Sequence, residues 1–301
     1  MLERFRFPFK AMGGPAEIQI VADDWGTAEA AFRGAWHRIA AIESKYSRYK
    51  LDSLISRINA AAGTNLWIEC DEETSNLLDY ADRLYTESDG LFDLTSGVLR
   101  SHWNFHSTAI PSEKSLRAAL ELIGWRKVER KEFEGRRNLV RLPINGMEID
   151  LGGLAKEFAV DESIREIKKL SLKGALVNMA GDIAAIGHTE GFAAWSIGIK
   201  HPTKVGLLSA QIQLTNASIA TSGLYERNII SNGIKYGHIL NPLTGWPSKG
   251  WESITVVHAQ AISAGAISTI GILKETKAID FLDSKNVRYL AIDERGNVYR
   301  K

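Results

Sequence analysis

A lysine follows two glycines where a strand is expected to give way to a helix. The segment Ile149–Asp161 reads IDLGGLAKEFAVD and contains Asp150, the pair Gly152-Gly153 and Lys156. Paired glycines allow a tight turn and a close approach to a ligand. The first turn of a helix exposes unpaired N–H groups, which together with an ammonium group favour an anion. The segment therefore predicts a phosphate site, and the alternative is a plain glycine turn with a solvated lysine.

Several other short clusters combine glycines with polar or aromatic residues at expected turns. They are Met12-Gly13-Gly14 before the first expected strand, Tyr46-Ser47-Arg48-Tyr49 with Ser53 and Asn59, Asp89–Gly97 (DGLFDLTSG), Asn178–Asp182 (NMAGD), and the segments TSGLYER and YGHILNPLTG with Thr221, Ser222, Tyr225, His238 and Thr244. The last two segments should lie together as a hairpin. Taken singly, Tyr49 or Phe92 is more often a core aromatic, and His238 is more often a histidine with satisfied hydrogen bonds.

The composition limits the class of protein. A chain of 301 residues with 45% hydrophobic residues can bury a large core, in one domain or in two joined ones. Its 37 basic residues balance 36 acidic ones, so no bulk charge favours a nucleic acid or an anionic membrane. The single cysteine, Cys70, cannot form an intrachain disulfide and is expected to be a half-buried bystander rather than a nucleophile. No segment reaches the roughly 20 apolar residues of a membrane span.

Apolar residues at helical spacing predict helices over 28–46, 77–85 and 116–123. The third should start at Pro111-Ser112 and end at Gly124. A fourth should follow Gly152-Gly153 after a short strand, MEID. Its buried face would contain Val160, Ile164, Ile167 and Leu170.

Strands are expected in AEIQIVA, NLVRLP, ALVNMAG, WSIGIKH, LSAQIQL, ITVVHA, YLAID and VYRK. ERGN should form the hairpin turn between the last two, and the polar segment ERKEFEGRRN should form a hairpin or a surface loop. Few helices interrupt the strands after residue 172. The pattern therefore predicts an α+β fold with largely antiparallel sheets.

Taken in order, the clusters resemble the ApbE family, the FAD:protein FMN transferases once described as thiamine biosynthesis lipoproteins. The resemblance runs from Met12 to Thr269 and rests on YSRYKLDSLISRIN, FDLTSG, IDLGGLAK with AVD, NMAGDI, TSGLYER and HILNPLTG. It implies a T-fold-related α+β architecture, with one ApbE-like domain over residues 1–301. Two intimately joined α/β subdomains would enclose an FAD cleft, and the sequence marks no boundary between them.

The resemblance also implies a chemistry. Members of the family cleave the diphosphate of FAD with the help of a divalent cation, usually magnesium. They transfer FMN to a serine or threonine hydroxyl of an acceptor flavoprotein and release AMP. By motif match, FAD contacts are expected from Met12, Tyr49, Leu91, Phe92, Asp93, Asp150, Lys156 and His238. Lys156 and His238 would assist catalysis, while the Gly153 carbonyl and Thr269 would bind the metal.

One motif departs from the family. Relatives carry an aspartate, a principal metal ligand, where SAGAISTIG places Gly265. Because a hard cation prefers anionic oxygens, this loss should weaken magnesium binding, and Gly265→Asp is expected to tighten it and raise turnover. Glu157 stands where relatives commonly have glycine, and it either faces solvent or supplies a replacement ligand. Asp182 is another candidate carboxylate.

Three functions therefore stay open. The largely intact cleft motifs favour an FMN transferase with an altered metal site. The alternatives are a flavin- or nucleotide-binding protein that has lost catalysis, and an FAD pyrophosphatase that uses water as the acceptor. A protein acceptor would carry a short motif resembling Ser/Thr-Gly-Ala-Thr. Family members are often exported lipoproteins, whereas MLERFRFPFK contains no signal-peptide run and no cysteine, which favours a cytoplasmic location.

Overall fold

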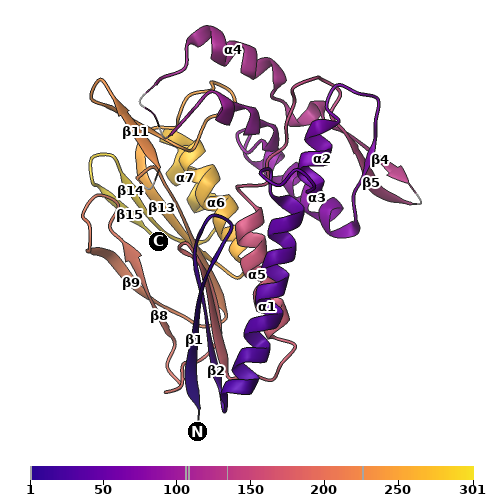
Figure 1. The fold of residues 1–301 in the computed structure, drawn as a ribbon. Coiled ribbons are helices and arrows are strands. Elements are labelled where there is room, and N and C mark those ends of the chain that lie inside the picture. Colours follow the sequence, from indigo (N-terminus) through magenta and orange to yellow (C-terminus); the bar gives the residue numbers. More distant parts are fainter. Residues whose placement is uncertain (1, 106, 108, 134, 226) are drawn as a thin grey trace.

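The computed structural model describes residues 2–105, 107, 109–133, 135–225 and 227–301 (Figure 1). Its centre is an eight-stranded sheet with the order β1-β2-β6-β7-β10-β13-β14-β15, in which every neighbouring pair is antiparallel. These strands are β1 (Glu3–Ala11), β2 (Gly14–Ala22), β6 (Gly174–Met179), β7 (Asp182–Gly187), β10 (Ala217–Gly223), β13 (Trp251–His258), β14 (Arg288–Asp293) and β15 (Val298–Arg300). The expected α+β class with antiparallel sheets is confirmed.

Three smaller sheets surround the large one. They are the hairpin β8 (Trp195–Lys200) with β9 (Leu208–Leu214), the hairpin β11 (Asn228–Ser231) with β12 (Ile234–Gly237), and the sheet of β3 (Ile68–Glu69), β5 (Arg136–Arg141) and β4 (Glu129–Phe133). The β4–β5 pair confirms a hairpin in ERKEFEGRRN, of which residue 134 lies outside the described residues.

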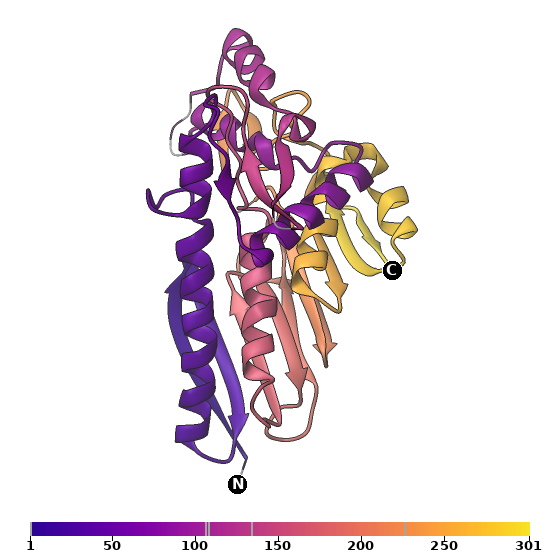
Figure 2. The ribbon, with the colours of Figure 1, turned by 90° about the vertical axis from the view of Figure 1, so that its right-hand side faces the viewer.

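The helices are α1 (Trp25–Tyr46), α2 (Leu54–Ala60), α3 (Glu72–Glu87), α4 (Glu113–Leu122), α5 (Ala155–Ile167), α6 (Ala261–Leu273) and α7 (Ala278–Ser284), with short 3-10 helices at Leu94–Ser101, Trp125–Lys127 and Glu275–Lys277. Among them, α1, α5 and α6 cover one face of the large sheet (Figures 1 and 2). α5 packs against α1, α6 and strands β6 and β7. None of the helices in the described residues is long and apolar enough to cross a bilayer.

Alternation along the strands divides the core into two layers. Ile18 and Ile20 of β2 point into the layer shared with the helices, while Val21 points into the layer shared with the β8–β9 hairpin. In β6, Val177 joins the helical layer and Leu176 joins the other. Burying each of these side chains contributes about 2 kcal/mol to the stability of the fold, which stabilises the packing on both faces of the sheet.

Asp161 fixes the start of α6 from the neighbouring helix α5. Its carboxylate accepts hydrogen bonds from the backbone N–H groups of Ala261, at 2.7 Å, and Ile262, at 2.9 Å. These N–H groups have no partner within their own helix because they belong to its first turn. The AVD end of the sequence motif therefore sets the position of a helix that borders the site described below.

Asp161→Ala is expected to lower the free energy of unfolding by about 2 kcal/mol, because two first-turn N–H groups lose a charged acceptor. Chemical denaturation would measure the change. Asp280→Ala, at an exposed position on α7, is the control and should change the free energy by less than about 0.5 kcal/mol. Equal stability of the two variants would contradict the capping role.

Several expectations about elements need correction. MEID is not a strand. The Ile149 N–H donates to the Asn59 side chain and the Asp150 N–H donates to the backbone oxygen of Leu94, so this segment does not pair with a neighbouring strand. Leu170 lies beyond the end of α5 and is 41% exposed. The helix expected between Pro111-Ser112 and Gly124 is confirmed as α4, with Ser112 as its N-cap and Ile123 as its C-cap. β1 was not expected, although Phe5, Phe7 and Phe9 alternate along it.

Cys70 is more deeply buried than expected, with 2% of its surface exposed. Burial raises the pKa of its thiol to about 11. A thiol that stays protonated at neutral pH is a poor nucleophile. The expectation that Cys70 is a bystander therefore agrees with its surroundings.

Candidate functional site

Two adjoining cavities open where the helices meet the large sheet. One has a volume of about 250 Å³ and the other about 490 Å³. Both are lined by Arg100, Asp150, Gly152, Lys156, Ala180 and His238, which therefore mark their junction. Such a pair of cavities suits an elongated ligand with a charged centre.

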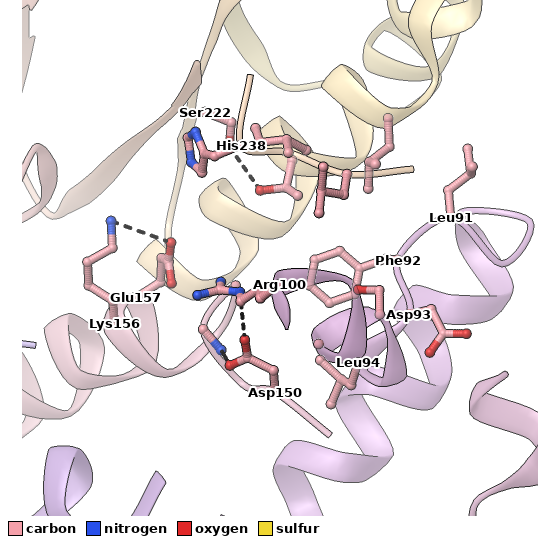
Figure 3. Close-up of a pocket in the computed structure, with 18 of the residues that line it drawn as sticks. Leu91, Phe92, Asp93, Leu94, Arg100, Asp150, Lys156, Glu157, Ser222 and His238 are labelled. Carbon is pink, nitrogen blue, oxygen red and sulfur yellow. Dashed lines mark hydrogen bonds and ion pairs between the residues drawn. The ribbon is translucent and has the colours of Figure 1, made fainter. Parts of the chain in front are cut away.

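Asp150 organises the junction. One carboxylate oxygen accepts from the Gly152 N–H at 2.8 Å, and the other pairs with Arg48 at 3.3 Å and with Arg100 at 3.0 Å. Figure 3 shows the pair of Asp150 with Arg100. Gly97 allows this packing, because a Cβ there would lie 2.8 Å from the Asp150 Cβ. The two guanidinium groups are thereby held beside the Gly152-Gly153 turn, where N–H groups not bonded to Asp150 could donate to an anion.

The sequence expected a helix directly after this turn, and α5 begins there at Ala155. Its N-cap residue, Leu154, supplies no side-chain hydrogen bond. Lys156 lies in the first turn and forms an ion pair with Asp182, at the start of β7. The ammonium group borders both cavities, as a phosphate-binding lysine would require.

Glu157 is buried, with 7% of its surface exposed, and does not face solvent. Burial, together with the neighbouring carboxylate of Asp182, raises the pKa of Glu157 well above its usual range. Its Oε1 lies 3.9 Å from the Lys156 Nζ, and its Oε2 has no hydrogen-bond partner within the described structure. In Figure 3 Lys156 and Glu157 lie on the same side of the cavity, facing Phe92 across it.

Hydroxyl groups form another part of the smaller cavity. The Ser222 Oγ on β10 lies 2.8 Å from the Ser268 Oγ and 2.9 Å from the Thr269 Oγ1, both on α6. Ser222 and Thr269 line this cavity together with Gly153 and Glu157. A strand, two helices and the glycine turn therefore bring oxygen atoms to one place.

His238 follows the β11–β12 hairpin and borders both cavities. Its Nδ1 lies 3.2 Å from the backbone oxygen of Arg227, which can only accept, so Nδ1 carries the proton and the neutral ring leaves Nε2 as an acceptor. Burial is the largest cause that lowers the pKa of His238 to about 4, and the charges of Arg227, Arg100 and Lys156 contribute to the same shift. His238 is therefore uncharged at neutral pH and can orient a hydroxyl group without adding charge.

The His238 imidazole is expected to show no titration between about pH 5 and about pH 8 in an NMR pH series, because its pKa falls from 6.5 to about 4. The unfolded chain binds the extra proton first as the pH falls. His238 therefore lowers the stability of the folded state between pH 6.5 and about pH 4 and leaves it unchanged above. His238→Gln would identify the signal, and a midpoint near 6.5 would contradict the assignment.

The residues expected to contact a flavin nucleotide fall into two groups. Met12 and Tyr49 line the larger cavity, whereas Leu91, Phe92 and Asp93 line the smaller one. Met12 occupies the two-residue turn between β1 and β2 and has a φ of 49°, so it follows a strand rather than preceding the first one. Tyr49 is 80% exposed and free to cover a planar ring.

Asp93 borders the smaller cavity, but its carboxylate is directed elsewhere. Oδ1 accepts from the Thr95 N–H at 2.7 Å, and Oδ2 accepts from the Trp125 N–H at 2.9 Å. In Figure 3 this carboxylate points away from Lys156. Asp93 therefore holds the Leu91–Asp93 turn in place beside the cavity.

Asp150, Gly153, Lys156, His238 and Thr269 also line these cavities. All the residues that the sequence predicts to contact FAD or the metal therefore lie at one cavity or the other. Thr221 and Ser222 lie in strand β10 rather than in a turn, and the β11–β12 hairpin connects them to His238. Sequence reasoning did not single out Arg48 or Arg100 as site residues. Arg48 stands inside the quoted YSRY motif, whereas no pattern marked Arg100.

A divalent cation would find oxygen donors here, which are the donors that magnesium prefers. Glu157 and Asp182 each supply a buried carboxyl oxygen that accepts no hydrogen bond within the described residues, although that of Asp182 is ion-paired with Lys156, and Thr269 supplies a hydroxyl. The described residues hold no group of three or more His, Cys, Asp or Glu side chains placed to share a metal. The donor set therefore fits a cation that also takes oxygens from its substrate or from water.

Comparisons with known proteins agree with this architecture. The chain is 29% identical over 259 residues to the FAD:protein FMN transferase of Haemophilus influenzae, a match that covers 83% of this chain and 75% of that protein. It is 30% identical over 232 residues to the FAD:protein FMN transferase of Treponema pallidum, covering 72% of this chain and 64% of that one.

Solved structures give the same result. The ApbE protein of Thermotoga maritima superposes with a TM-score of 0.89 at 28% identity, covering 99% of this chain and 97% of that one. The apo flavinyl transferase ApbE of Pseudomonas stutzeri gives a TM-score of 0.87 at 22% identity, covering 100% and 95%, which shows a shared fold. The ApbE family model matches residues 12–291, and the chain therefore belongs to the ApbE family.

Proposed function

We propose that this protein is an FAD:protein FMN transferase. One observation carries the proposal: two cavities meet at a junction whose lining includes Lys156, Arg100 and Gly152. FAD consists of two ring systems joined by a diphosphate, so its rings can occupy the cavities while the diphosphate lies at the junction beside Lys156 and Arg100. The names of the relatives support the same activity.

The reaction requires an acceptor hydroxyl to attack the phosphorus on the FMN side. A new phosphoester bond forms, the bridging oxygen leaves with AMP, and the hydroxyl proton is released. Lys156 and Arg100 would stabilise the charge that develops on the phosphate oxygens, as preorganised cations do in phosphoryl transfer. His238, being neutral with an open Nε2, would position the attacking hydroxyl.

Magnesium is the cation that the family relationship implies. Bound beside Glu157, Asp182, Thr269 and the Gly153 carbonyl, it would neutralise charge on the diphosphate. Met12, Tyr49, Leu91, Phe92, Asp93 and Asp150 would then line the bound FAD, with Asp93 and Asp150 acting through the turns that they hold. The FAD cleft between two joined subdomains of a single domain is part of the same proposal.

The partner would be a flavoprotein that exposes a serine or threonine hydroxyl in a Ser/Thr-Gly-Ala-Thr-like motif. Tyr49, which lines the larger cavity, is 80% exposed, and this exposure supports access for such a segment. A cytoplasmic site of action stays a prediction from the sequence.

Separating the products by chromatography would test the proposal. The purified protein is incubated with FAD and magnesium, with and without an acceptor domain, and AMP and free FMN are quantified. A transferase releases AMP only when the acceptor is present and leaves little free FMN. Equal amounts of AMP and free FMN without an acceptor would indicate a pyrophosphatase, and unchanged FAD would indicate a binding protein.

A further inference from the structure

Glu157 occupies the space that a side chain at Gly265 would need. A Cβ built on Gly265 would lie 2.6 Å from the Glu157 Cγ and 3.0 Å from its Oε1. Atoms essentially never approach a Cβ this closely, so a side chain at position 265 requires the Glu157 side chain or one of the two helices to shift. The Glu157 carboxylate in its present position and a side chain at position 265 of α6 therefore exclude each other.

The Glu157 carboxyl group that fills this space is shielded from solvent. The Glu157 side chain is 10% exposed, and its Oε2 has no hydrogen-bond partner within the described structure. The neighbouring Asp182 side chain is 3% exposed and pairs with Lys156. Two buried carboxyl groups thus lie beside a single ammonium group, so a bound cation would stabilise the ionised form of both.

We propose that Glu157 supplies the principal carboxylate of a divalent cation site, and that Gly265 is the reciprocal position that must carry no side chain to admit it. The site extends to Asp182 and to the hydroxyls of Ser222 and Thr269. In this chain the carboxylate reaches the cavity from α5 instead of α6. The inference deepens the proposed function, and it rests on that function for the role of the cation.

The close approach of Glu157 to Gly265 argues against the expectation from the sequence that Gly265→Asp tightens magnesium binding. Gly265→Asp alone does not restore a metal site, because its Cβ collides with Glu157 and its carboxylate adds a third negative charge. That variant is expected to lose stability and to bind the cation no more tightly. Combining it with Glu157→Gly removes both the collision and the surplus charge, so the double variant should recover most of the cation affinity.

The test measures the affinity of the FAD-free protein for Mn²⁺, by electron paramagnetic resonance. Glu157→Gln keeps the shape of the side chain and removes its charge, so the dissociation constant should rise at least about tenfold. Glu166→Gln, on the same helix but outside both cavities, should leave it unchanged. Wild-type affinity in Glu157→Gln, or the absence of Mn²⁺ binding in the wild type, would overturn the proposal.

The Mn²⁺ binding measurement and the FMN transfer assay can give independent results. If the wild type transfers FMN and Glu157→Gln binds Mn²⁺ normally, the inference is wrong and the function stands. If Glu157→Gln weakens Mn²⁺ binding but the wild type modifies no acceptor, the cation site stands and the function is wrong.

Discussion

Lys156→Met is expected to lower the rate of FMN transfer by about 10²–10³-fold, which is the usual effect of removing one preorganised charge from a phosphate or oxyanion site. The ammonium group borders both cavities and is held by its ion pair with Asp182. Methionine retains the length of the side chain without the charge. Single-turnover measurements of AMP release at saturating FAD would give the change.

Lys169→Met is the matched control, because Lys169 lies just beyond the same helix and pairs with the exposed side of Glu166. This variant should keep the wild-type rate. Lys156→Arg should recover only part of the rate, since a planar guanidinium cannot reproduce the point charge of an ammonium group. A rate in Lys156→Met within about threefold of the wild type would remove Lys156 from the phosphate site.

Asp150→Ala is expected to lower the free energy of unfolding by about 3 kcal/mol and to abolish FAD binding. The substitution leaves Arg48, which is mostly buried, with one partner fewer and also frees the Gly152 N–H. Arg100 is 45% exposed and adds less to the loss. Urea denaturation and fluorescence titration with FAD would measure the two effects.

Glu148→Gln separates the general loss of an ion pair from the particular role of Asp150. Glu148 also pairs with Arg48, at 2.9 Å, but lies further toward solvent. Its substitution should cost less than about 1 kcal/mol and leave FAD binding intact. If Asp150→Ala and Glu148→Gln behaved alike, Asp150 would not be the organiser of the junction.

Periodicity predicted the long elements well because their cores are regular. α1 buries Ala28, Ala35, Ile39, Ile42 and Tyr46 at helical spacing, and the sequence alone marks that pattern. The helix after the glycine pair was also located, although Leu170 was placed on its buried face. These predictions succeeded because the helical periodicity and the glycine turn each lie within, or a few residues from, the element that they predict.

The errors have physical causes as well. β1 alternates Phe5, Phe7 and Phe9 with basic residues, a readable strand pattern that Pro8 disguised; an edge strand tolerates this proline. MEID looked like a strand because the apolar Met147 and Ile149 alternate with the charged Glu148 and Asp150. Its end instead bonds to Asn59, whose side chain both accepts from and donates to the backbone of Ile149. A tertiary contact of this kind leaves no local signal.

The relation between Glu157 and Gly265 illustrates the limit most clearly. Each departure from the family pattern was visible in the sequence, and taken separately the glycine suggested a lost ligand and the glutamate an ambiguous one. Only the packing of α5 on α6 shows that one fills the space beside the other. The meaning of such a pair depends on distance in space, which a single sequence does not encode.

The central claim is that this chain transfers FMN to a protein hydroxyl. The most direct measurement is the intact mass of an acceptor domain carrying a Ser/Thr-Gly-Ala-Thr-like motif, after incubation with the protein, FAD and magnesium. The account predicts a gain of one FMN, absent when the acceptor serine or threonine is replaced by alanine. An acceptor of unchanged mass, with FAD bound but intact, would contradict the account.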